Sequence, residues 1–195
     1  PEVALFSAGG TVSREYAPLF AQNGIYVIDN SSAWRRDETV PLVVPEINGD
    51  VIKKKDFIIA NPNCSTIQLV MALAPLKDVF GIRRVTVSTY QSVSGSGMKA
   101  IEQMEGERNN TPVEKVYPWP IDRNVIPQGG AFLENGFTEE EQKLVFETCK
   151  ILRDKDIQVA ATVVRVPVTG GHSISASVEC NMPCPAEKVT NLLSA

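Results

Sequence analysis

The chain has 195 residues, of which 43% are hydrophobic and 22% are charged, and its formal net charge is −4. These values are typical of a globular protein with one ordinary domain or parts of two, and they exclude an intrinsically disordered chain. The acidic balance argues against a nucleic acid or an anionic membrane as partner, because neither attracts a negatively charged protein.

The first sixty residues show the rhythm of a parallel α/β sheet. Short apolar runs predict buried strands, and a segment of helical periodicity between two of them has Ser13 as its expected N-cap and Gly24 as its stop signal. The expected elements are a strand at 3–6, a helix at 13–22, strands at 25–28 and 57–60, and a short strand at 42–44. This order predicts a Rossmann-type sheet that ends near residue 61.

The rest of the chain predicts an α+β unit. Residues 65–80 are apolar at helical spacing, with Ser65 as the first residue of a capping box, and Pro75 is expected to kink or split this helix. Thr138 and Glu141 fit a second capping box at the start of an amphipathic helix. The other expected elements are strands at 84–91 and 157–168, a helix at 98–107, a loop at 109–136, a strand at 172–180 that pairs with the strand before it, and a last helix from 185.

The four cysteines lack the spacing of a zinc site, so we expect free thiols in a reducing compartment. No apolar stretch reaches the roughly 18 residues of a membrane span, and no signal peptide is visible. We therefore expect a cytoplasmic protein without a metal site. The chain starts at Pro1 and stops at Ala195 within an expected helix, which indicates an excised piece.

Cys64 is the sharpest candidate for chemistry. It lies between the strand at 57–60 and the helix expected from Ser65. The unpaired N–H groups and the dipole of a helix N-terminus favour a thiolate, which is the nucleophile needed to capture an acyl group. A buried, inert cysteine is the alternative, and the position alone does not decide between the two.

Arg165 and His172 are further candidates for a functional role, on the expected strands at 157–168 and 172–180. His172 is the only histidine of the chain and the only imidazole that could act as an acid or base, but a packed histidine is more common on such an apolar strand face. Arg165 has the strand parity of buried residues, so its guanidinium needs an anion. That anion is either a substrate carboxylate or a neighbouring acidic side chain.

Two further patterns are weaker. Glu140, Lys143 and Glu147 follow one another at i, i+3 and i+7 of one helix, which usually indicates a solvated face with weak ion pairs. Residues 95–100 match the dinucleotide fingerprint G-x-G-x-x-A, but no complete βαβ unit with an acidic residue follows. We interpret these glycines as a loop beside a pocket.

Together these motifs resemble the bacterial aspartate-semialdehyde dehydrogenases, in the family's order and over nearly the whole chain. The strings that carry the resemblance are FSAGG (6–10), IDNSSAWR (28–35), LVVPE (42–46), NPNCST (61–66), STYQSVSG (88–95), and RVPV (165–168) followed by GHS (171–173). The resemblance implies a partial dinucleotide-binding domain of Rossmann type at 1–61. It also implies a catalytic and dimerisation domain at 62–195 that is incomplete at its C-terminus.

The resemblance implies an enzyme that reduces L-aspartyl 4-phosphate with NADPH to aspartate semialdehyde and phosphate, on the route to lysine, threonine and methionine. Cys64 would be the thioester nucleophile, His172 the acid and base, and Gln91 the group that orients the substrate. Arg165 would bind the α-carboxylate and Glu140 the α-amino group. A homodimer is also implied.

The remaining implied residues bind phosphate and cofactor. Those that fit the phosphate site are Arg35, Asn63 and Lys143. Those expected to touch NADP are Ser7, Ala8, Gly9, Gly10, Ser31, Ser32, Ser94 and Gly95. Ile174 departs from the family, whose members commonly carry a polar or acidic residue after the His-Ser pair. The family's first glycine-rich loop would lie before Pro1, so we expect this piece to bind NADPH poorly.

Two alternatives remain open. N-acetyl-γ-glutamyl-phosphate reductase shares the cysteine and histidine chemistry, although its motif differs after the nucleophile; glyceraldehyde-3-phosphate dehydrogenase is more distant. A piece that serves only folding or dimerisation, without catalysis, belongs to another class.

Overall fold

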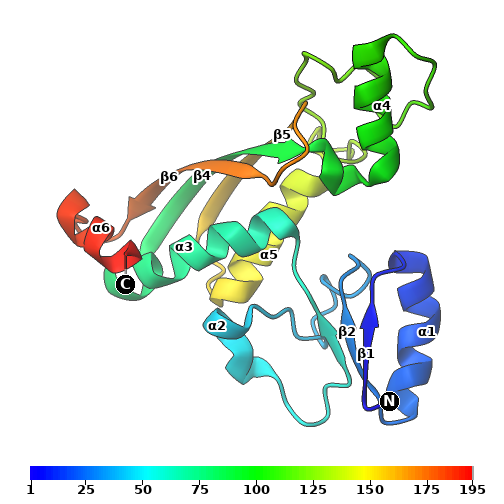
Figure 1. Ribbon diagram of the computed structural model, residues 1–195. Coiled ribbons are helices and arrows are strands. Elements are labelled where there is room, and N and C mark those ends of the chain that lie inside the picture. Colours follow the sequence, from blue (N-terminus) through cyan, green and yellow to red (C-terminus); the bar gives the residue numbers. More distant parts are fainter. Residues whose placement is uncertain (195) are drawn as a thin grey trace. The chain divides into compact units, whose positions relative to one another are not determined.

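The computed structural model of the protein describes residues 1–194 (Figure 1). The chain divides into two compact units. The first comprises Pro1–Arg83, Phe146–Ile157 and Cys180–Ala195, and the second comprises Arg84–Val145 and Gln158–Glu179. Each unit therefore combines segments that are far apart in the sequence.

The first unit contains a parallel three-stranded sheet with the order β1-β2-β3. Its strands are β1 (Val3–Phe6), β2 (Tyr26–Asp29) and β3 (Ile58–Ala60), and α1 (Gly10–Gln22) connects β1 with β2. Val27 and Ala60 are fully buried in the sheet, and Ala17 of α1 is fully buried as well. This arrangement confirms the predicted parallel α/β fold.

Four further helical elements belong to the first unit. They are α2 (Pro45–Asn48), η1 (Gly49–Val51), α3 (Cys64–Phe80) and α6 (Ala186–Leu193). Helix α3 supplies much of the core through Leu69, Val70 and Leu73. The short strand expected at 42–44 is reduced to one bridge between Leu42 and Ala60.

Two predicted helix starts are wrong. Helix α1 begins at Gly10 after Gly9, whose φ of 94° suits glycine, and Ser13 is instead buried inside the helix, where its hydroxyl accepts the Trp34 indole N–H at 2.9 Å. Helix α3 is capped by Asn63, not by Ser65. The α3 helix also continues through Pro75 without being split.

The second unit contains a mixed sheet with the order β5-β4-β6. Its strands are β4 (Ile82–Ser92), β5 (Gln158–Val166) and β6 (Ser173–Cys180). The prediction that the segments at 157–168 and 172–180 pair with each other is wrong, because the long strand β4 lies between them. β5 runs parallel to β4 in a register that extends from Arg84 opposite Gln158 to Ser92 opposite Val166.

The predicted loop at 109–136 packs on α4 (Met98–Asn109), which follows the short helix η2 (Val93–Ser96). A core cluster holds the two segments together, formed by Val93, Ala100, Met104, Tyr117, Ile121 and Ile126. Polar groups of α4 add to this. The Gln103 side chain accepts the N–H groups of Val116 and Tyr117 at 2.7 and 2.8 Å, and the Glu107 carboxylate accepts those of Ile121 and Asp122 at 2.7 and 2.9 Å.

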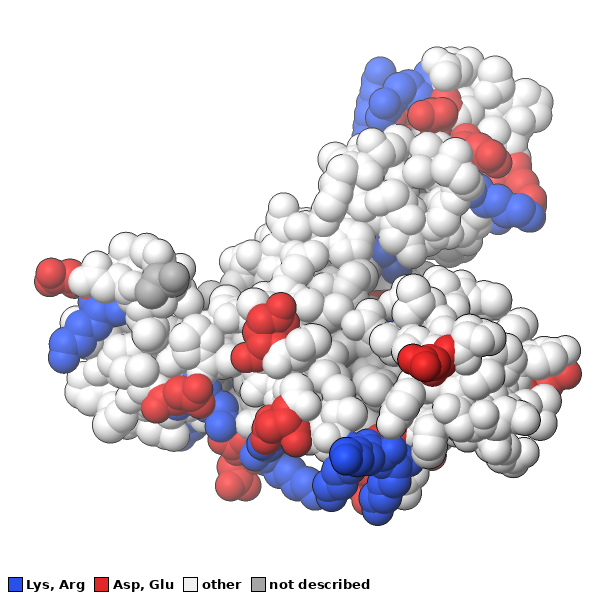
Figure 2. All heavy atoms as spheres, turned by 60° about the horizontal axis from the view of Figure 1, so that its bottom comes forward, with Lys and Arg blue, Asp and Glu red and all other residues white. Residues whose placement is uncertain are grey.

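Helix α5 (Glu139–Leu152) starts with the predicted capping box. The Thr138 N–H donates to the Glu141 carboxylate at 2.7 Å, and the Glu141 N–H donates to the Thr138 hydroxyl at 3.4 Å. On the face shown in Figure 2, basic and acidic groups lie next to one another. Within residues 1–194 we find no helix that combines the length and the hydropathy of a membrane span.

Candidate active site

Cys64 is the first residue of α3, and its thiol is free and exposed. Asn63 caps the helix: its Oδ1 accepts the N–H groups of Ser65 at 2.9 Å and Thr66 at 3.4 Å. The helix is 17 residues long, so its aligned peptide dipoles concentrate positive potential at this end. The buried cysteine considered from the sequence is therefore not what the structure shows.

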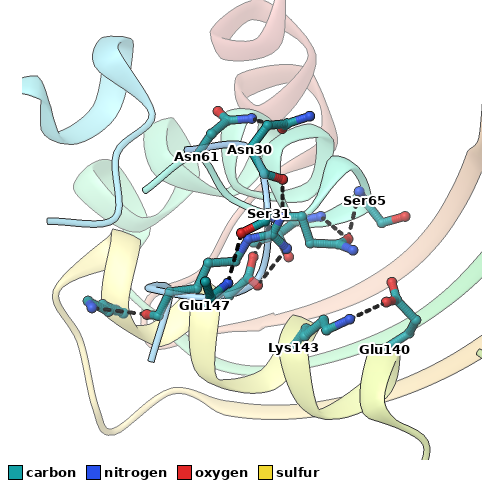
Figure 3. A network of polar contacts seen from close by, with 12 residues as sticks. Asn30, Ser31, Asn61, Ser65, Glu140, Lys143 and Glu147 are labelled. Atoms are coloured by element: carbon teal, nitrogen blue, oxygen red, sulfur yellow. Dashed lines mark hydrogen bonds and ion pairs between the residues drawn. The ribbon is translucent and has the colours of Figure 1, made fainter. Parts of the chain in front are cut away.

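A buried ion pair lies next to the cap (Figure 3). The Arg35 guanidinium donates to Glu147 at 3.2 Å and to the Asn30 carbonyl at 3.0 Å, while the other Glu147 oxygen accepts the Asn63 N–H at 2.7 Å. Glu147 has no exposed surface. Burial raises the pKa of Glu147, although Arg35 and the Asn63 N–H act in the opposite direction.

The solvated face expected for Glu147 is therefore wrong, and its part in the site was missed. A signal was present in the sequence. Glu147 follows Leu144 by three residues and precedes Ile151 by four, which is the spacing of one helix face, and both neighbours are fully buried. A carboxylate on such a face needs a cation, and Arg35 supplies it.

The carboxyl edge of the parallel sheet carries most of the residues expected to touch the cofactor. Residues 7–10 follow β1, and Ser31 follows β2, whose last residue is Asp29. Because the strands are parallel, these turns lie at the same edge, where open α/β sheets bind ligands. The buried Asp29 fixes Ser31 by accepting its hydroxyl at 2.7 Å and its N–H at 3.2 Å, and Asn61 donates to Asn30 at 2.7 Å (Figure 3).

In the second unit, Gln91 and Arg165 lie opposite each other near the ends of β4 and β5. Gln91 is 1% exposed and Arg165 is 8% exposed, so the strand parity predicted for Arg165 is confirmed. His172 lies at the end of β4 as well, because its Nδ1 accepts the backbone N–H of Ser92 at 3.0 Å. Since Nδ1 is an acceptor, the neutral ring carries its proton on Nε2.

Four influences act on the pKa of the His172 ring. Burial and the positive charge of Arg165 lower its pKa, against the weaker opposing effects of Glu140 and a hydrogen bond with the Gly171 backbone. A lowered pKa keeps the imidazole neutral at neutral pH. In that state the Nε2–H is a hydrogen-bond donor.

Gly95 leaves room for the side chains of His172 and Arg165. A methyl group at this position would lie 3.0 Å from His172 Cε1, 3.1 Å from His172 Nε2 and 3.3 Å from Arg165 Nη1. Contacts this short force the neighbouring groups to move. Ser94 and Gly95, both expected to touch the cofactor, thus lie in the same part of the unit as His172.

We expect Gly95→Ala to lower kcat roughly tenfold, because the added methyl displaces the imidazole and such misplacement costs rate. Steady-state kinetics measures this. Gly170→Ala is the matched control, since a methyl at Gly170 meets no atom within 4 Å. Equal activities of the two variants would contradict the role assigned to the Gly95 contact.

A pocket of about 380 Å³ lies beside Arg165. Its wall includes Glu140, Ser96, Tyr117 and Ile126, and the Tyr117 hydroxyl donates to Ser96 at 2.8 Å. Glu140 also forms an ion pair of 2.6 Å with Lys143, in the i, i+3 spacing predicted from the sequence (Figure 3). The volume is in the range of small-molecule sites. The wall contains one negatively charged group, Glu140, and one positively charged group, Arg165.

The structure thus gathers the predicted residues into two groups. The group in the first unit consists of Cys64, Arg35, Asn63, residues 7–10 and residues 31–32. The group in the second unit consists of Gln91, Ser94, Gly95, Glu140, Lys143, Arg165 and His172.

Comparison with known proteins gives the family. Residues 73–195 match the family model for the semialdehyde dehydrogenase dimerisation domain, and residues 2–55 match the model for the semialdehyde dehydrogenase NAD binding domain. The chain belongs to the semialdehyde dehydrogenase family. These two matches, with the α/β fold, confirm the resemblance that the motifs indicated.

Relatives within the semialdehyde dehydrogenases cover almost the whole chain. The chain is 51% identical to aspartate-semialdehyde dehydrogenase of Aquifex aeolicus. The match covers 98% of this chain and 59% of that relative. A crystal structure of aspartate semialdehyde dehydrogenase II complexed with ASA, from Vibrio cholerae, matches with a TM-score of 0.95 and 46% identity over 99% of this chain and 60% of that one. The enzyme from Candida albicans with NADP matches with a TM-score of 0.75 and 29% identity over 98% and 55%. The chain therefore spans about three fifths of its curated relatives.

Proposed function

We propose that this chain carries the catalytic residues of an aspartate-semialdehyde dehydrogenase that reduces L-aspartyl 4-phosphate to aspartate semialdehyde and phosphate. The observation that carries the proposal is the exposed thiol of Cys64 at the first position of a long helix. The names of the relatives support the choice of substrate.

In the proposed reaction the Cys64 thiolate attacks the acyl carbon of aspartyl phosphate. A carbon–sulfur bond forms, the carbon–oxygen bond to phosphate breaks, and phosphate leaves with the electron pair. A bound nicotinamide cofactor would supply the hydride needed to reduce the resulting thioester. The Nε2–H of His172 donates a hydrogen bond to the oxyanion that forms on the reduced carbon, and the electron pair of this oxyanion breaks the carbon–sulfur bond, which releases the aldehyde and the thiolate.

The charges of the pocket support an amino-acid substrate. We assign the α-carboxylate to Arg165, the α-amino group to Glu140, and the alignment of the acyl group to Gln91. The pocket beside Arg165 presents a cation and an anion to one small volume, which suits a zwitterion. Arg35, Asn63 and Lys143 are the proposed phosphate ligands.

The sheet edge of the first unit fits a dinucleotide. A side-chain carbon at Gly9 would meet no atom within 4 Å, so a ligand can approach this backbone closely. We propose that the residues at 7–10 and 31–32, with Ser94 and Gly95, hold the cofactor, and that the cofactor is NADP, as in the Candida albicans relative.

The setting of the enzyme is proposed in the same way. A division at residue 61 would separate the cofactor domain from the catalytic and dimerisation domain, and the latter would form a homodimer. The reaction would take place in the cytoplasm, on the route to lysine, threonine and methionine.

The substrate assignment is tested with the protein in its natural full length. We expect phosphate-dependent reduction of NADP with aspartate semialdehyde, with kcat/KM at least about a hundredfold above that for N-acetylglutamate semialdehyde. The reason is that an acetylated amino group carries no charge for Glu140. A preference for the acetylated substrate would favour the reductase alternative, and use of NAD at equal efficiency would refute the cofactor assignment.

A further inference from the structure

Glu147 is an acidic side chain with no exposed surface, and the reaction proposed above does not use it. Its two carboxylate oxygens have different partners. One accepts from the Arg35 guanidinium at 3.2 Å and the other accepts the backbone N–H of Asn63 at 2.7 Å. Both are donors, which is the environment of an ionised carboxylate.

The Asn63 N–H bond has a direct consequence for the neighbouring thiol. Asn63 is the N-cap of α3, and its side chain accepts the N–H groups of Ser65 and Thr66. Glu147 therefore holds the backbone of the residue that both caps the helix and precedes Cys64. Through this bond α5 contacts the backbone directly before the thiol.

The charges around Glu147 are balanced. Arg35 is its ion-pair partner, and the Lys150 ammonium one turn further along α5 donates to the carbonyls of Arg35, Asp37 and Val40 at 3.0, 2.7 and 3.1 Å. The negative charges of Asp37 and Glu38, together with that of Glu147, favour the charged form of Lys150. Removal of one charged partner would leave the other uncompensated in a buried place.

We propose that Glu147 is a positioning residue for Cys64. Glu147 holds the Asn63 peptide, and its negative charge compensates the positive charge of Arg35 next to the nucleophile. This inference rests on the proposed role of Cys64. It assigns to α5 a contribution to the reactivity of the thiol.

The test is the alkylation rate of Cys64 by iodoacetamide as a function of pH, resolved by mass spectrometry of the Cys64 peptide without substrate. In Glu147→Gln the Arg35 cation stays and the carboxylate charge is lost, so the midpoint for Cys64 should fall by roughly one pH unit. In Arg35→Met the carboxylate charge stays and the midpoint should rise. The double variant Arg35→Met/Glu147→Gln carries neither charge, so its midpoint for Cys64 should return toward that of the unmodified protein.

Two internal controls accompany the titration. Glu139→Gln removes an exposed carboxylate from the same helix and should leave the Cys64 midpoint unchanged. The exposed thiol of Cys184 should titrate alike in all variants. A midpoint that stays or rises in Glu147→Gln, or that moves in the same direction in both single variants, overturns the proposal, because a merely structural role disturbs both variants alike.

The result can be separated from the proposed function. Undiminished turnover of a Cys64→Ala variant would remove the function while leaving the thiol titration of Glu147→Gln unaffected. Loss of turnover in Cys64→Ala without a shift in Glu147→Gln would remove only the role of Glu147.

Discussion

Cys64→Ala is expected to lower kcat by at least about a thousandfold, since alanine offers no atom that can form the acyl intermediate. The thiol is exposed at the end of α3, so its replacement removes no buried contact of comparable size. Stability should therefore change little. Steady-state reduction of NADP by aspartate semialdehyde and phosphate, together with a thermal unfolding curve, measures both effects.

Cys184→Ala is the control for this variant, because Cys184 is also free and exposed. It should keep the activity of the unmodified protein. Turnover of Cys64→Ala within a few fold of that control would contradict covalent catalysis at Cys64.

Arg165→Leu is expected to raise KM for aspartate semialdehyde roughly a hundredfold, because the proposed charge pair with the substrate carboxylate would be lost. Its effect on kcat should be smaller than its effect on KM. The variant should also raise the pKa of His172, since the positive charge of Arg165 is one of the causes that lower it. At a pH between the two pKa values the variant would carry more imidazolium.

Kinetics and NMR measure the two consequences of Arg165→Leu separately. The His172 resonance is assigned by its absence in His172→Gln, and its titration gives the pKa. Arg84→Leu serves as control, because Arg84 is an exposed arginine on β4 that pairs with Gln158. An unchanged KM, or a His172 pKa that falls, would contradict the assignment of Arg165.

Local patterns predicted much of the fold. The apolar run at 3–6 is β1, the run at 25–28 overlaps β2 with a shift of one residue, and the Thr138 capping box starts α5 as expected, because such signals act within a few residues. The order of β5, β4 and β6 was not predictable in this way. It depends on non-local pairing, and the sequence adjacency of β5 and β6 favoured the wrong neighbour.

Helix starts show the same limit. Ser65 and Asn63 are both good capping residues, and the capping-box pattern favoured Ser65. The structure selects Asn63, whose backbone is held by Glu147 from a helix more than eighty residues later in the chain. Such a long-range contact leaves no local trace in the sequence.

The candidate site was predictable to a different degree for each residue. The burial of Arg165 followed from strand parity. Gln91 was named only by the family resemblance, and the structure places it opposite Arg165 in the register of β4 and β5. The roles of Glu140 and Lys143 came only from the family resemblance, because their i, i+3 pair also suits an ordinary surface. Glu147 was misjudged as solvated, although its spacing from two buried apolar residues indicated otherwise.

The most direct test of covalent catalysis is a rapid-mixing experiment without phosphate. The natural full-length protein is mixed with NADP and aspartate semialdehyde, and NADPH is followed by absorbance. We predict a burst of about one NADPH for each Cys64, then a sharp slowing because the thioester has no acceptor, and renewed turnover when phosphate is added. A burst of the same size in Cys64→Ala, or steady turnover without phosphate, would contradict the mechanism.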